Sequence, residues 1–140
     1  MGLKTTPQFN FALPVLLLLI AAVALSGCST FAPVRAAKTV EQKAFALYGT
    51  FAIYQEAGVD IVRNETLPIG VRRAVQNADA AAKPIADSLL AATLEAQRVR
   101  AQVAAGTSTN ARLVIVTNNL EDWVARAEPL INNLINAVTQ

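Results

Sequence analysis

The sequence predicts an all-α protein, an antiparallel up-down-up three-helix bundle with coiled-coil-like seams that follows a cleaved signal peptide and a short tether. Three observations support this class. Apolar residues recur at alternating steps of four and three from residue 40 to residue 137, which is the spacing of one helix face. Two short breaks containing Pro or Gly divide this pattern into three segments. No segment alternates apolar and polar residues as a half-buried strand does.

Residues 1–27 have the features of a secretory signal peptide. Lys4 provides a positive charge at the start, and residues 11–25 form an apolar run that only Pro14 interrupts. A membrane-spanning helix needs about 20 apolar residues, so this run is too short to span a bilayer and is typical of a signal peptide. We therefore expect this segment to be removed.

The apolar run ends in the tetrapeptide Leu25-Ser26-Gly27-Cys28, which contains the single Cys of the chain. It resembles the lipobox of bacterial lipoproteins, in which the bond before the cysteine is cut and the cysteine is acylated, for example with palmitate. The resemblance implies cleavage between Gly27 and Cys28 and a lipid on Cys28. Because Ser29 rather than Asp follows, it also implies the outer membrane, facing the periplasm. A Gram-positive host would place Cys28 on the outer face of its membrane. A signal peptide with a chance cysteine and an uncleaved anchor are the alternatives.

Residues 28–38 are expected to form the lipidated cysteine and its tether, since they contain Pro33 and small residues without a sustained period. A fully extended segment 29–37 reaches roughly 30 Å, at about 3.3 Å per residue. Arg35, Lys38 and Lys43 follow the lipid site in sequence. They either contact anionic headgroups, at about 1 kcal/mol each near the surface, or form a plain solvated surface.

The first helix is expected over residues 39–65. Thr39 and Gln42 have the spacing of a capping box, and Pro68 disfavours helical geometry in the residue before it. Gly58 lies on the apolar stripe and indicates the close approach of another backbone. The stripe consists of Val40, Ala44, Leu47, Phe51, Tyr54, Gly58 and Ile61.

The second and third helices are expected over residues 68–105 and 110–138. Pro68 suits a first turn, and Gly106 suits the position after a helix end. The stripe of the second helix is Val71, Val75, Ala78, Ala82, Ile85, Leu89, Ala92, Ala96, Val99 and Val103. The stripe of the third is Leu113, Val116, Leu120, Trp123, Ala127, Leu130, Leu134 and Ala137, flanked by Val114, Ile115, Val124 and Ile131 because this helix faces two others.

Two prolines, Pro84 and Pro129, lie inside these helical patterns. Each removes one helix hydrogen bond and is expected to kink its helix. Counted from the turn between the two helices, both kinks fall at about the same height. We interpret them as a shared bend that keeps the helices in contact. A hinge, or a groove opened by the freed carbonyl groups, is the alternative.

The composition excludes several functions. The chain has no His and one Cys, so it cannot form a His-based triad, a Cys–His pair or an internal disulfide, and it lacks the common zinc and haem ligand sets. A formal charge of +2 does not predict a nucleic-acid partner. Glu56 and Asp60 are the best carboxylate pair for an enzyme, but their heptad positions point outward. We therefore expect no enzyme activity, no metal and no cofactor besides the lipid on Cys28.

These features predict a membrane-anchored periplasmic lipoprotein with a binding or structural role toward a protein or envelope partner. Short connections between long helices make neighbours antiparallel, so the turn after the second helix returns toward the membrane. The far end then carries Asn64, Glu65, Arg72 and Arg73, together with the C-terminus, as candidate partner contacts. A phage- or prophage-encoded lipoprotein in lysis or superinfection exclusion is one alternative, and a carboxylate-based enzyme is another.

Overall fold

The computed structural model of the chain describes residues 32–140, and every regular element within them is a helix. The order is α2 (Ala32–Ala36), α3 (Val40–Arg63), α4 (Ile69–Ala104) and α5 (Asn110–Thr139). The predicted all-helical class is therefore confirmed for this part of the chain. The predicted signal peptide and the tetrapeptide at 25–28 lie outside the described residues.

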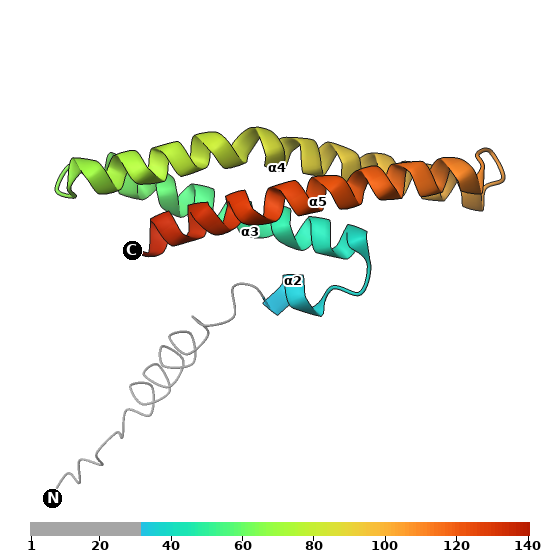
Figure 1. The fold of residues 1–140 in the computed structure, drawn as a ribbon, viewed down its shortest axis with the longest axis horizontal. Coiled ribbons are helices and arrows are strands. Elements are labelled where there is room, and N and C mark those ends of the chain that lie inside the picture. Colours follow the sequence, from blue (N-terminus) through green and yellow to red (C-terminus); the bar gives the residue numbers. More distant parts are fainter. Residues whose placement is uncertain (1–31) are drawn as a thin grey trace, which may run out of the picture. The chain divides into compact units, whose positions relative to one another are not determined.

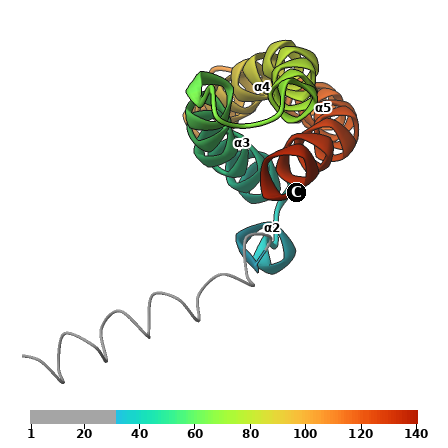
Figure 2. The same ribbon diagram turned by 90° about the vertical axis from the view of Figure 1, so that its left-hand side faces the viewer.

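The three long helices each contact the other two, and Figure 2 shows them grouped around a common centre. Figure 1 shows α4 alongside both α3 and α5 over most of its length. The core lies where the three helices meet, and most of its buried side chains come from the predicted stripes. The core residues that are at most 2% exposed include Ala44, Leu47, Phe51, Ala82, Ala86, Leu89, Ala96, Leu120, Ala127, Ile131 and Leu134.

Small and large side chains share the buried face of α4. Ala82, Ala86 and Ala96 have no exposed surface, and neither does Leu89. Alanines let neighbouring helices come close, while leucine fills the wider layer between them. Thr93 lies on the same buried face, and its hydroxyl donates to the Leu89 carbonyl at 2.6 Å, which satisfies the polar group that this position buries.

At the start of α3, only one of the two hydrogen bonds of the predicted capping box forms. Thr39 Oγ1 accepts a hydrogen bond from the Gln42 backbone N–H at 3.2 Å. The Gln42 side chain does not return to Thr39. Its Oε1 accepts from the backbone N–H of Lys38 at 2.9 Å, so it holds the residue before the cap and fixes the direction in which the chain enters the helix.

The turn between α4 and α5 is built by a glycine and a second threonine cap. Gly106 has a φ of 72°. Glycine adopts this backbone conformation without steric strain, whereas residues with a Cβ atom are strained in it. The Gly106 N–H donates to the Val103 carbonyl and the Thr107 N–H to the Gln102 carbonyl, the pairing of a Schellman motif. Thr109 Oγ1 then accepts from the Arg112 N–H at 3.2 Å and starts α5.

The tether predicted over 28–38 is wrong for the part that the structure describes, because Ala32–Ala36 form α2. This helix contacts α3, and Val34 is 6% exposed and belongs to the core. Pro33 is compatible with a first helical turn, where its missing N–H has no partner to lose. Five residues are too few to show a helical period, so the sequence carried no sign of this helix beyond one apolar residue.

Unequal helix lengths explain where the predicted seam fails. α3 has 24 residues, α4 has 36 and α5 has 30. At 1.5 Å per residue, α5 ends about 9 Å before the start of α4, and α3 begins about 18 Å before the end of α4. Val114 and Ile115 were expected beside the seam but are 58% and 67% exposed, because α3 does not reach them. Val71 was expected in the seam and is also exposed, beyond the end of α5.

Gly58 makes room for side chains rather than for another backbone, which corrects the expectation from the sequence. A Cβ at this position would lie 3.1 Å from Cγ1 of Val75 on α4 and 3.6 Å from Cγ2 of Val138 on α5. Gly58 itself is buried. The glycine therefore lets two valines from different helices converge on α3.

We predict that Leu89→Asp unfolds the protein or lowers its stability by several kcal/mol, because an unpaired charge would replace a fully buried side chain. The matched control is Leu94→Asp on the same helix, where Leu94 is 52% exposed and the change should stay within about 0.5 kcal/mol. Thermal melting of residues 29–140, followed by circular dichroism, measures both. Equal melting temperatures for the two variants would contradict the observed packing.

Candidate functional site

The four candidate contact residues all lie at the turn between α3 and α4. Asn64 ends α3, Glu65 is in the turn, and Arg72 and Arg73 belong to the first turns of α4. No hydrogen bond or ion pair within residues 32–140 joins any two of the four. The structure thus brings these residues to one end without building them into a single polar cluster.

Asn64 has a structural role in this turn. Its Oδ1 accepts from the Thr66 N–H at 3.1 Å and from the Thr66 hydroxyl at 2.6 Å. Its own N–H donates to the carbonyls of Asp60 and Ile61 at 3.1 and 3.2 Å. A side chain that hydrogen-bonds its own backbone two residues on is a common way to fix a turn. Asn64 therefore positions its neighbours, and its amide oxygen already has partners.

The charged residues of the turn are available at the surface. Glu65 and Arg73 are exposed, and Arg72 is half-buried. None of the three forms an ion pair with any residue that the structure describes. The Nε atom of Arg72 is buried without a hydrogen-bond partner among these residues, although a buried unpaired donor is unfavourable. The turn therefore offers both signs of charge to a partner.

Exposed aliphatic side chains lie beside these charges. Ile69 is 65% exposed, and Val59 and Val71 are exposed as well. Figure 1 shows the turn projecting beyond the end of α5, so the start of α4 at Ile69 has no third helix beside it. Exposed apolar surface rimmed by polar groups is typical of a site of protein contact. The sequence analysis did not single out Ile69 and Val59. The only sign of them in the sequence is that each is apolar but lies outside the predicted seam.

A hollow of about 240 Å³ lies next to the turn, between α3 and α4. Typical small-molecule sites have about 300–1,000 Å³, so this one suits a single side chain of a partner better than a whole ligand. Asp79 lines it, and the Oδ1 atom of Asp79 is buried without a partner among the described residues. The other lining residues are Gln55, Gly58, Val59, Val62, Arg63, Val75 and Gln76.

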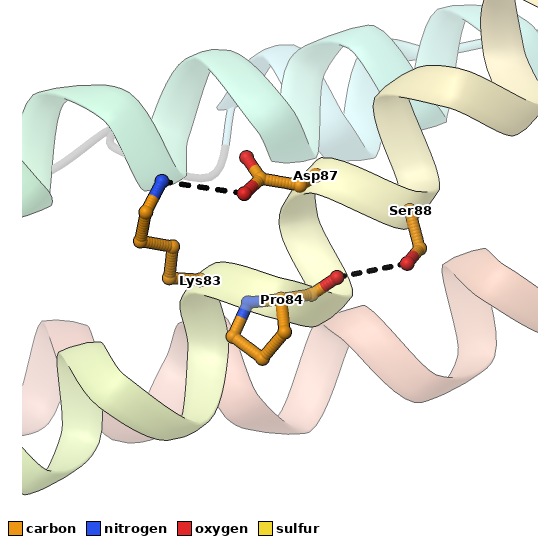
Figure 3. A network of polar contacts seen from close by, with 4 residues as sticks. All are labelled: Lys83, Pro84, Asp87 and Ser88. Atoms are coloured by element: carbon orange, nitrogen blue, oxygen red, sulfur yellow. Dashed lines mark hydrogen bonds and ion pairs between the residues drawn. The ribbon is translucent and has the colours of Figure 1, made fainter.

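Pro84 lies inside α4, which continues on both sides of it. The Pro84 carbonyl accepts a hydrogen bond from the Ser88 hydroxyl at 2.8 Å (Figure 3). In the same turn of the helix, Lys83 and Asp87 form an ion pair at 3.2 Å. A serine that bonds the carbonyl four residues back often bends a helix. The proline and the serine therefore act on the same turn, and the exposed ion pair adds at most about 0.5 kcal/mol.

Both prolines face solvent. Pro84 and Pro129 are exposed, and so are Ala80 and Ala125, whose carbonyls lose their helix partners to the two rings. Water can reach these residues, and a helix commonly curves with its convex side toward solvent. This arrangement agrees with a bend that wraps the helices around the core. Neither proline lines the hollow next to the turn between α3 and α4.

The candidate carboxylates Glu56 and Asp60 lie at the surface, and so does a second, adjacent pair of carboxylates on α5. Glu56 and Asp60 are exposed on α3, and Glu121 and Asp122 are exposed on α5. Within residues 32–140, no three His, Cys, Asp or Glu side chains are grouped so that they could hold a metal ion. Trp123 is half-buried against the core, with the Arg126 guanidinium 5.3 Å from its ring centre, which is cation–π distance.

A second hollow, of about 350 Å³, lies between residues 37–43 and α5. An ion pair crosses it, with Lys43 Nζ 2.8 Å from Glu128 Oε2. Glu121 and Ala125 line it as well. In the part of the chain that the structure covers, no helix combines the length and the apolar character needed to cross a membrane.

We predict that Glu56→Ala and Asp60→Ala, singly or together, leave the free energy of unfolding within about 0.5 kcal/mol of the wild type, because both side chains are exposed and unpaired with any described residue. Titration calorimetry with Mg²⁺, Ca²⁺ or Zn²⁺ should give no heat that depends on either carboxylate. A specific metal isotherm that both variants abolish would contradict this result and revive the enzyme hypothesis.

Comparison of the chain with protein-family models, with curated proteins and with solved structures finds no match. The candidate site is therefore assigned from the residues and contacts of this chain, with the exposed turn between α3 and α4 as its centre.

Proposed function

We propose that this protein is a bacterial lipoprotein with a binding or structural role, in which acylated Cys28 holds a three-helix bundle at a membrane. In this proposal the bundle faces the periplasm from the outer membrane and presents the turn between α3 and α4 to a protein or envelope partner. The observation that carries the proposal is the tetrapeptide at 25–28, which follows an apolar run and directly precedes the helical unit.

The contacts between helices support the up-down-up arrangement that the proposal includes. Glu41 pairs with Arg100, and Gly58 faces Val75, so residue numbers rise along α3 as they fall along α4. Lys43 pairs with Glu128, and Gly58 also faces Val138, so numbers rise together along α3 and α5. We propose that α3, α4 and α5 pack with coiled-coil-like seams and that α2 is an addition to this bundle.

The surface at the turn supports a binding role. Glu65 and Arg73 are exposed charges without ion pairs to other described residues, and Ile69 is a large exposed aliphatic side chain between them in sequence. Burial of Ile69 by a partner would remove apolar surface from water, and the flanking charges would select the partner and its orientation. The partner we propose is thus a protein with an apolar pocket and charges of both signs around it.

A photo-crosslinking amino acid at Glu65 or Arg73, introduced one at a time in living cells, tests this role. We expect one discrete crosslinked product from each probe in the acylated protein and none in the Cys28→Ser variant, which cannot be anchored. A probe at Asp87, exposed on α4 away from the turn, is the matched control and should capture nothing. No product from either probe, while the protein remains in the outer membrane, would contradict the proposed site.

A further inference from the structure

We infer that the side of the bundle that carries α2 lies directly on the surface of the bilayer, and that the packing of α2 on α3 keeps it there. The occupant that this surface fits is a layer of anionic phospholipid headgroups. The inference rests on the proposed acylation of Cys28 and adds an orientation to the proposed function.

The first argument is the length of chain between the lipid and the first described helix. Three residues, 29–31, separate Cys28 from Ala32, and a fully extended chain of that length spans no more than about 11 Å. Because α2 contacts α3, this span limits how far Cys28 can lie from a helix that is packed on the bundle. If residues 29–37 formed an extended tether instead, they would allow roughly 30 Å.

The second argument is that α2 is attached by a buried side chain. Val34 is 6% exposed and belongs to the core cluster that includes residues of all three long helices. The chain after α2 is held as well, because the Lys38 N–H donates to Gln42 Oε1 at 2.9 Å. The described segment from Ala32 to α3 is therefore held on the bundle, and releasing it requires Val34 to become exposed.

The third argument is the charge of this segment. Arg35 and Lys38 are exposed, and residues 29–40 contain no acidic residue. The next acid in the sequence, Glu41, is buried and paired with Arg100. Two acids of α5, Glu121 and Glu128, line the hollow beside Lys38, and Glu128 is paired with Lys43. Two free cations within ten residues of the lipid complement the negative surface of a bilayer that contains anionic lipids, and this attraction falls off within one Debye length.

The inference assigns the apolar contact with the lipid surface to an exposed side chain of α3, Ile53. Ile53 is 64% exposed on the helix against which α2 packs. Figure 2 shows α2 on the side of the molecule away from α4. The outer surface of α4, which includes exposed Leu94, would accordingly face the aqueous side. The orientation therefore makes opposite predictions for Ile53 and Leu94, two aliphatic residues of similar size and exposure.

The test uses the acylated full-length protein in vesicles of phosphatidylethanolamine and phosphatidylglycerol. Acylation consumes Cys28, so Ile53→Cys and Leu94→Cys each provide a single site for an environment-sensitive fluorophore. We expect spin-labelled lipid to quench the fluorophore at position 53 at least threefold more than that at position 94. Equal quenching at the two positions, in protein that floats with the vesicles, would overturn the inference and leave the lipoprotein assignment intact. Wild-type protein that does not float would overturn that assignment and this inference with it.

The role of α2 is tested by adding Val34→Asp to the Ile53→Cys protein. We expect the vesicle association to persist and the quenching at position 53 to fall to the level of position 94, because α2 would no longer shorten the tether. Circular dichroism checks that the long helices remain folded. A second variant, Arg35→Glu with Lys38→Glu, should lower the quenching in anionic vesicles and leave it unchanged in phosphatidylcholine vesicles. Unchanged quenching in both variants would overturn the role of α2 and of its charges.

Discussion

The whole architecture depends on one helix, α4, packing against two neighbours through a narrow buried face. Ala82, Ala86 and Ala96 on this face are fully buried, and such small side chains allow close approach on both sides. Leu89 fills the layer between them. Because α4 is longer than α3 and α5, each of its ends has only one long-helix neighbour. The core thus occupies the middle of the molecule, and apolar side chains become exposed toward both ends.

This constraint also separates the surfaces of the molecule. The end at the turn between α3 and α4 carries exposed Ile69 beside the charges of Glu65 and Arg73, a combination suited to a protein partner. Another side carries α2, with Arg35 and Lys38 exposed and Val34 buried. In our proposals the first surface binds a partner and the second lies on lipid. Two functions can therefore use different surfaces of one bundle without competing for the same residues.

The long helices were predicted well because the apolar pattern repeats over many residues in each and because residues that favour helix ends flank them. Thr39 starts α3 and Gly106 follows α4, as expected from their residue types. The failures arise where burial depends on other segments. Val114 and Ile115 are exposed because of the length of α3, which the period of α5 cannot reveal. The pairing of buried Glu41 with Arg100 could not be predicted from local sequence, because the two residues are 59 positions apart. The helix α2 was missed because five residues are too short to show a helical period. The four candidate contacts lie together at one turn, as expected, whereas the exposed apolar residues beside them were not predicted.

The central claim is that a lipid on Cys28 joins this helical bundle to a membrane. Intact-mass spectrometry of the protein extracted from the envelope of a Gram-negative cell tests this claim most directly. The account predicts a chain that begins at Cys28 and carries the mass of a diacylglycerol thioether and an N-terminal acyl group. A chain that retains residues 1–27, or one in which Cys28 has a free thiol, would contradict it.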